Sequence, residues 1–178
     1  MPLDTATVGK GFALWLIPDE PVFSFLAREI SRLSRLYSTP RFDPHITLLG
    51  GIPLTEEEIQ AKASLLAGGI ERFKIELGEI GYRDEYFRCL FVEVVPNNPL
   101  LKAYEAACTV FGRQNEPPFM PHISLMYGKF PVRTRKDLAA QVGWISGLAC
   151  DIRRLLVYRV SGPTEEWKPV KEFGLTGY

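Results

Sequence analysis

The feature that most constrains the fold of this chain is an internal repeat. Shifting the 178-residue sequence by 77 positions aligns residues 40–51 with residues 117–128, and seven of the twelve positions are identical. A shift of 78 aligns residues 17–21 with residues 95–99. Repeats of about 20–50 residues are typical of solenoids, whereas a single duplication of this length favours two similar lobes related by a pseudo-twofold axis. Such an axis brings equivalent residues of the two copies face to face.

The first copy is predicted to run strand, helix, strand, helix, strand. The apolar run 12–17 indicates a buried strand, and helical spacing of apolar residues follows it. Asp19 is the expected cap of that helix, with Pro21 in its first turn. Thr55 begins a capping box that opens a second helix, which ends at Gly68-Gly69. Strands are expected over about 73–82 and 87–95.

The second copy repeats this order. A helix opens at Asn98-Pro99 and runs to about residue 111, and a short helix capped near Thr134 runs through Val142. Strands are expected over 152–160 and 167–175. The sequence therefore predicts one α+β domain spanning residues 1–178. In this bilobal, pseudo-twofold fold, two antiparallel-type sheets surround a central cleft and the helices lie outside.

Both histidines of the chain lie in matching tetrads within the repeat, Pro44-His45-Ile46-Thr47 and Pro121-His122-Ile123-Ser124. Residues i and i+2 of a strand share a face, so each histidine shares a face with a hydroxyl. A lone histidine in an apolar strand is more often structural than catalytic, but the paired occurrence favours function. Two imidazoles titrating near neutrality can supply a base and an acid on opposite sides of a phosphorus centre. Thr47 and Ser124 can donate hydrogen bonds to its non-bridging oxygens.

Composition narrows the class of protein further. The chain carries 21 Lys plus Arg against 21 Asp plus Glu, so long-range attraction to nucleic acid or an anionic membrane is not dominant. Its three cysteines lack C-x-x-C spacing, which favours a reducing compartment. No secretory signal and no apolar run of about 18 residues is present, so a cytoplasmic location is expected. The histidines lack a matching Cys or carboxylate constellation, so no metal site is expected.

The two tetrads resemble those of the two-histidine (2H) phosphoesterase superfamily, which is defined by two H-x-[ST] motifs. Residues 40–47 and 119–127 most resemble the cyclic phosphodiesterase group of plants and fungi, and the similarity extends to Trp15 and residues 87–91. The resemblance implies a bilobal enzyme without metal or cofactor. It would open ADP-ribose 1″,2″-cyclic phosphate to the 1″-phosphate and nucleoside 2′,3′-cyclic phosphates to 2′-phosphates, in tRNA splicing or RNA breakdown.

The resemblance also implies residue roles: His122 as base, His45 as acid, and Tyr127 and Trp15 as lining of the ligand site. Strict strand alternation would turn Tyr127 away from His122, so its role requires a twist or bulge near Gly128. Trp15 is equally consistent with a bulky core residue. For two further residues a structural role is simpler than a ligand contact: Phe87 as a core residue and Arg41 as a solvated one.

Two other functions remain open. One is an RNA-end 2′,3′-cyclic or 2′,5′ phosphodiesterase of the same superfamily. The other is a phosphate-ligand binding module without catalysis, although a pure binder need not keep a proton donor and a proton acceptor. The expected partner is a small-molecule cyclic phosphate, with no membrane, no extended nucleic-acid binding, and a monomeric state.

Overall fold

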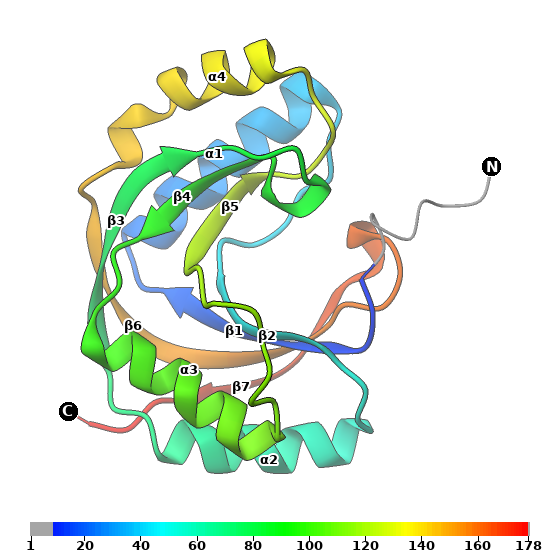
Figure 1. The fold of residues 1–178 in the computed structure, drawn as a ribbon, viewed down its shortest axis with the longest axis vertical. Helices are drawn as coiled ribbons and strands as arrows, with labels where there is room; N and C mark the ends of the chain where they lie inside the picture. The colour runs from blue at the N-terminus through cyan, green and yellow to red at the C-terminus, as the bar shows by residue number, and fades with distance from the viewer. Residues whose placement is uncertain (1–8, 178) are drawn as a thin grey trace.

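The computed structural model describes residues 9–177 of the chain (Figure 1). The first copy of the repeat forms β1 (Phe12–Pro18), α1 (Val22–Tyr37), β2 (Ile46–Ile52), α2 (Glu56–Gly68) and β3 (Phe73–Gly81). The second copy forms β4 (Leu90–Val94), α3 (Asn98–Phe111), β5 (His122–Met126), α4 (Val132–Gln141) and β6 (Ala149–Arg159), and β7 (Lys168–Gly174) follows. The predicted order of elements in both copies is confirmed.

All pairings between the seven described strands are antiparallel, which confirms the predicted fold class. β1 pairs with β2 and β6, β6 also pairs with β3 and β7, and β4 lies between β3 and β5. The two halves also meet where Ile46 of β2 pairs with Ile123 of β5. Since each of these isoleucines directly follows a histidine, this pair brings His45 and His122 to the same place. The pairings thus join the two expected sheets into one seven-stranded system.

The helices lie outside the strands, α1 and α4 at one end of the molecule and α2 and α3 at the other (Figure 1). One helix of each copy packs against the histidine strand of the other copy: α1 contacts β5, and α3 contacts β2. This reciprocal exchange is the arrangement that a pseudo-twofold axis produces, and it interlocks the copies. No helix among the described residues is both long and apolar enough to cross a membrane.

β1 shows how one strand serves two environments. All seven of its residues are buried. Phe12, Leu14 and Leu16 point into the main core, which the helices cover. The alternate residues Ala13, Trp15 and Ile17 belong to a smaller cluster on the other face. One face of β1 thereby packs in the main core, and the other face contributes Ala13 and Trp15 to the wall of the central cavity.

Helix starts are the least accurate part of the sequence prediction. The Thr55 capping box is confirmed, with reciprocal hydrogen bonds between Thr55 and Glu58. Asp19 as the cap of α1 is wrong, because the helix begins after Pro21 and the Asp19 carboxylate instead lies 3.0 Å from Arg153 Nε.

Two further boundaries differ from the prediction. α4 begins after Pro131, whose fixed φ suits the residue before a helix, so Thr134 lies inside the helix and does not cap it. Phe87 is not in a strand. It lies in a 3₁₀ turn, Tyr86–Arg88, before β4 begins at Leu90.

Candidate active site

A cavity of about 340 Å³ lies between the two halves of the molecule. Its walls contain all six residues singled out in the sequence: Trp15, His45, Thr47, His122, Ser124 and Tyr127. The rest of the lining consists of two aromatic residues, two cations, two aliphatic residues and three glycines: Phe87, Trp167, Lys10, Arg88, Ala13, Val160, Gly9, Gly50 and Gly51. The structure therefore brings the two distant tetrads together around one space.

The two imidazoles are held in the same way. His45 Nδ1 lies 2.6 Å from the carbonyl oxygen of Asp43, and His122 Nδ1 lies 2.8 Å from that of Met120. A carbonyl oxygen only accepts, so Nδ1 must donate its proton in both rings. Each neutral ring then keeps an unprotonated Nε2 for other partners. In both copies the acceptor is the residue just before the proline of the tetrad, and a residue before proline favours extended backbone.

The surroundings lower the pKa of both histidines. Burial lowers the pKa of His45 to about 3, a hydrogen bond to Asp43 opposes this, and repulsion from His122 adds to it. Burial also lowers the pKa of His122, and the nearby Arg88 and Arg83 lower it further. The hydrogen bond to Met120 acts in the other direction. Both rings are therefore mainly neutral at neutral pH in the free protein.

The Trp15 ring covers one face of the His45 imidazole. The two rings are stacked with centroids 3.5 Å apart and planes inclined by 10°, and Tyr158 stacks on the Trp15 ring at 3.9 Å. Trp15 is only 2% exposed. Trp15 is thus a buried core residue that also lines the cavity, and its contact with a ligand stays a prediction.

The two hydroxyls differ. Ser124 Oγ is buried and donates to the backbone oxygen of Phe87 at 2.8 Å. Thr47 is exposed, and its hydroxyl makes no hydrogen bond with any residue in the described range 9–177. Thr47 can therefore donate to a ligand at once, whereas Ser124 must first turn away from Phe87.

Tyr127 lies just beyond β5, which ends at Met126, and it lines the cavity because the alternation of β5 is interrupted between Ser124 and Met126. Its ring stacks on Phe42 with centroids 3.8 Å apart. Burial raises the pKa of Tyr127, so its phenol stays protonated and available as a donor. The expected departure from alternation is present as a register shift of the bulge type: Leu90 pairs with Met126 but Phe91 pairs with Ser124, so β5 has one extra residue just before Tyr127.

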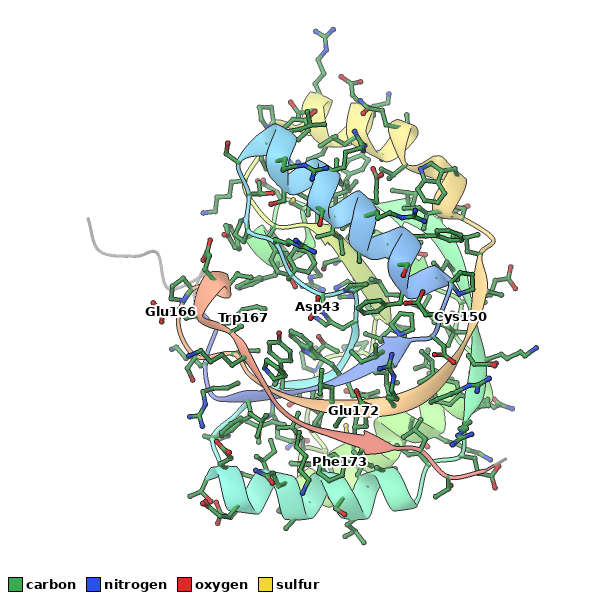
Figure 2. All side chains as sticks on the ribbon, turned by 180° about the vertical axis from the view of Figure 1, so that it is seen from behind. Asp43, Cys150, Glu166, Trp167, Glu172 and Phe173 are labelled. Atoms are coloured by element: carbon green, nitrogen blue, oxygen red, sulfur yellow. The ribbon has the colours of Figure 1, made fainter. Side chains whose placement is uncertain are left out.

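Three charged or aromatic residues of the cavity wall were not predicted from the sequence: Lys10, Arg88 and Trp167. Lys10 and Arg88 are 78 positions apart, the second offset of the repeat, and that offset could have found them. Arg41 does not line this cavity. Arg41 and Asp43 line a neighbouring cavity that shares Trp15 and Trp167 with the first one. Asp43 and Trp167 are labelled in Figure 2.

Other reactive groups lie elsewhere. In the part of the chain that the structure describes, no group of three or more His, Cys, Asp or Glu side chains is arranged to hold a metal ion. Cys89, Cys108 and Cys150 are free thiols. Burial raises the pKa of Cys89 to about 12 and that of Cys150 to about 11, so neither is an activated nucleophile.

Comparison with known proteins assigns this architecture to a family. Residues 10–175 match the family described as "Cyclic phosphodiesterase-like protein". The chain is 22% identical over 166 residues to "Cyclic phosphodiesterase" of Arabidopsis thaliana, covering 89% of this chain and 92% of the relative. It is 26% identical over 213 residues to "2',3'-cyclic-nucleotide 3'-phosphodiesterase" of Yarrowia lipolytica, covering 89% and 96%.

Solved structures share the fold. E. coli LigT in its apo form has a TM-score of 0.60 at 16% identity, covering 96% of this chain and 99% of LigT. TT0787 of Thermus thermophilus has a TM-score of 0.66 at 18% identity, covering 94% and 98%. At these identities the likeness shows the fold alone.

Proposed function

Because this chain belongs to the cyclic phosphodiesterase-like family of 2H phosphoesterases, we propose that it opens two kinds of cyclic phosphate by His/His acid–base catalysis. The substrates are ADP-ribose 1″,2″-cyclic phosphate, opened to the 1″-phosphate, and nucleoside 2′,3′-cyclic phosphates, opened to 2′-phosphates. The carrying observation is the pair of imidazoles, which line one cavity in one fixed tautomer.

The reaction needs one neutral and one protonated imidazole. The neutral Nε2 takes a proton from water, and the water oxygen forms a bond to phosphorus. The bond from phosphorus to the 3′ oxygen (2″ in the ADP-ribose substrate) breaks on the opposite side. The other imidazole donates its proton to that departing oxygen. The charge states of the two rings are then exchanged, and proton exchange with water resets them.

The free protein lacks a protonated imidazole at neutral pH, and the negative charge of the substrate favours one. Both imidazoles have lowered pKa values, and an anionic phosphate placed between them favours protonation of one ring. Hydrogen bonds from Thr47 and Ser124 to the non-bridging oxygens stabilise the charge that builds up in the transition state. Binding and activation are thus coupled through the same phosphate group.

Different observations favour opposite assignments of His45 and His122 as base and acid. The family resemblance implies His122 as base and His45 as acid. The lower pKa of His45 favours the opposite order, because His122 holds a proton more readily in the free protein. The Trp15 ring stacked on His45 acts against this preference, since an aromatic face attracts a cation. The two orders predict opposite pH behaviour in the single histidine variants.

One observation bears on the choice of substrate. The name of the Yarrowia lipolytica relative places its broken bond at the 3′ oxygen of a 2′,3′-cyclic nucleotide, which leaves a 2′-phosphate. Transferred to this chain, it supports the proposed regiochemistry. The second candidate, an RNA-end phosphodiesterase, uses the same chemistry on a longer substrate. A role in tRNA splicing or RNA breakdown, a monomeric state and a cytoplasmic location stay predictions.

The test is a product analysis. Purified protein is incubated with ADP-ribose 1″,2″-cyclic phosphate, the four nucleoside 2′,3′-cyclic phosphates and an RNA oligomer ending in a cyclic phosphate. Phosphorus NMR and chromatography then identify each product. We expect the 1″-phosphate and the 2′-phosphates. Exclusive formation of 3′-phosphates would overturn the regiochemistry, and absence of any ring opening would favour the binding-module hypothesis.

A further inference from the structure

The cavity contains a second pair of repeat-related residues, and both are cations. Lys10 and Arg88 line the cavity, one from each copy of the repeat. β1 begins at Phe12 and β4 begins at Leu90, so each cation lies two residues before the first strand of its copy. The pseudo-twofold relation that pairs the histidines therefore also pairs these two charges.

The backbone on both sides of Lys10 is fixed. Gly9 and Gly162 exchange two hydrogen bonds of 3.1 Å, and the oxygen of Gly11 accepts from the amide of Val160 at 2.9 Å. A Cβ atom on Gly9 would lie 2.0 Å from the oxygen of Val160, so only glycine fits there. Lys10 is thereby held at the wall of the cavity by the segment that follows β6.

The two cations are balanced differently. Arg88 donates from Nε to the Glu85 carboxylate at 2.8 Å, which offsets its charge. Lys10 makes no ion pair with any described residue from 9 to 177. Among the described residues, the exposed Lys10 thus places at the cavity wall a positive charge that no ion pair offsets. A nucleoside 2′,3′-cyclic phosphate has one negative charge, and the histidines and hydroxyls already account for its recognition.

We propose that Lys10 binds a second phosphate of the substrate, carried on the nucleoside or ribose whose cyclic phosphate is opened. This assignment rests on the proposed function and extends it to specificity: cyclic phosphates with an additional phosphate or diphosphate are the preferred class. A lysine ammonium suits this task, because it is a point charge with three donors that can follow a flexible phosphate. A 5′-phosphorylated nucleoside and an ADP-ribose diphosphate present the same chemistry.

Matched substrates isolate the effect of the second phosphate. Adenosine 2′,3′-cyclic phosphate is compared with the same compound carrying a 5′-phosphate, and kcat/KM is measured for wild type, Lys10→Gln and Lys10→Arg. We expect Lys10→Gln to lower kcat/KM about tenfold for the 5′-phosphorylated substrate, mainly through KM, and less than about twofold for the other. Lys10→Arg should retain most of the preference. Equal losses on both substrates, or no loss on either and none on ADP-ribose 1″,2″-cyclic phosphate, would overturn the assignment.

A control variant and a third substrate distinguish a direct contact from an effect of overall charge. Lys102→Gln removes one positive charge from α3, which lies outside the cavity, and should leave both substrates unaffected. ADP-ribose 1″,2″-cyclic phosphate tests the diphosphate source. A loss on this substrate alone assigns Lys10 to the diphosphate, and a loss on the 5′-phosphorylated nucleoside alone assigns it to a terminal phosphate. Equal loss in Lys102→Gln would reduce the effect to overall charge and contradict the proposal.

Binding of reaction products keeps the test independent of turnover. Titration calorimetry compares adenosine 2′,5′-bisphosphate with adenosine 2′-phosphate on wild type and Lys10→Gln. We expect wild type to prefer the bisphosphate and Lys10→Gln to lose that preference. If no cyclic phosphate is hydrolysed, the proposed function fails while this titration still decides the role of Lys10. Identical preferences in both proteins would refute that role.

Discussion

His45 and His122 make the same backbone contact from equivalent positions, yet their surroundings differ. Each donates from Nδ1 to the carbonyl two residues before it, so the residue just before each tetrad fixes the tautomer. The differences come from neighbours: a stacked Trp15 beside His45, and Arg88 and Arg83 near His122. Residue identity therefore supplies the chemistry, and the rings and charges packed around each imidazole tune it.

The hydroxyls provide the first test. Thr47→Val should remove one hydrogen bond to a charged phosphate oxygen, worth about 1.5–3 kcal/mol, or roughly tenfold to 150-fold in kcat/KM. Ser124→Ala should cause a similar loss and also lower the free energy of unfolding by about 1 kcal/mol, because its bond to Phe87 is removed. Steady-state kinetics and urea unfolding measure both. Wild-type kcat/KM in both variants would show that other groups hold the phosphate.

At the residue scale, the site residues that could be predicted are those marked by the internal repeat or by the alternation of a strand. The two tetrads were recognisable because equivalent positions of a duplication meet at a twofold axis, and Thr47 and Ser124 followed by the period of a strand. Trp167 was not recognisable, because it enters the cavity from the C-terminal segment by a tertiary contact that no local pattern encodes. Lys10 was missed because a single lysine near a strand has no motif of its own, and only its 78-residue separation from Arg88 relates it to the repeat.

At the scale of elements, β1 supports His45 directly through Trp15. Trp15→Ala should lower the free energy of unfolding by about 3–5 kcal/mol, since a large buried ring is removed. Exposure of His45 to water should raise its pKa from about 3 toward the ordinary value. Chemical denaturation and NMR titration of the histidine ring measure the two effects. Trp15→Phe keeps a ring at this position and should give smaller changes in both.

An unchanged His45 pKa in folded Trp15→Ala would contradict the role of Trp15 in excluding water.

The element order of both copies was predictable, because apolar periodicity and the Thr55 capping box are local signals. The start of α1 was not, since Asp19 is a good capping residue by type but its carboxylate pairs with Arg153 of β6. Such a tertiary ion pair lies outside what local spacing can show.

At the scale of the whole molecule, neutral buried histidines make stability depend on pH. Unfolded His45 has a pKa near 6.5, and the folded value is about 3. Between these values the unfolded chain binds more protons, so the free energy of unfolding falls as pH falls from about 6.5, and above that pH the effect vanishes. Urea unfolding of wild type and His45→Asn from pH 4 to 8 measures it. His45→Asn should gain stability relative to wild type as pH falls, and a constant difference would contradict the buried neutral state.

Metal dependence is a second property of the whole protein. Activity should survive exhaustive chelation, since the two imidazoles supply both proton transfers and the hydroxyls bind the phosphate. The check is kcat/KM before and after dialysis against a strong chelator. Loss of activity that a divalent ion restores would contradict the proposed mechanism.

The central claim is that two imidazoles divide the proton transfers, and the pH dependence of kcat/KM in wild type, His45→Ala and His122→Ala tests it most directly. Each variant should lose about 10²–10⁴ of wild-type kcat/KM while remaining folded. The wild-type profile should be bell-shaped, with its maximum below pH 6.5 because both pKa values are lowered. Each variant should lose one limb, and which limb disappears identifies the base and the acid. A flat wild-type profile from pH 4 to 9 with chemistry rate-limiting, or near-normal kcat/KM in either folded variant, would contradict the account.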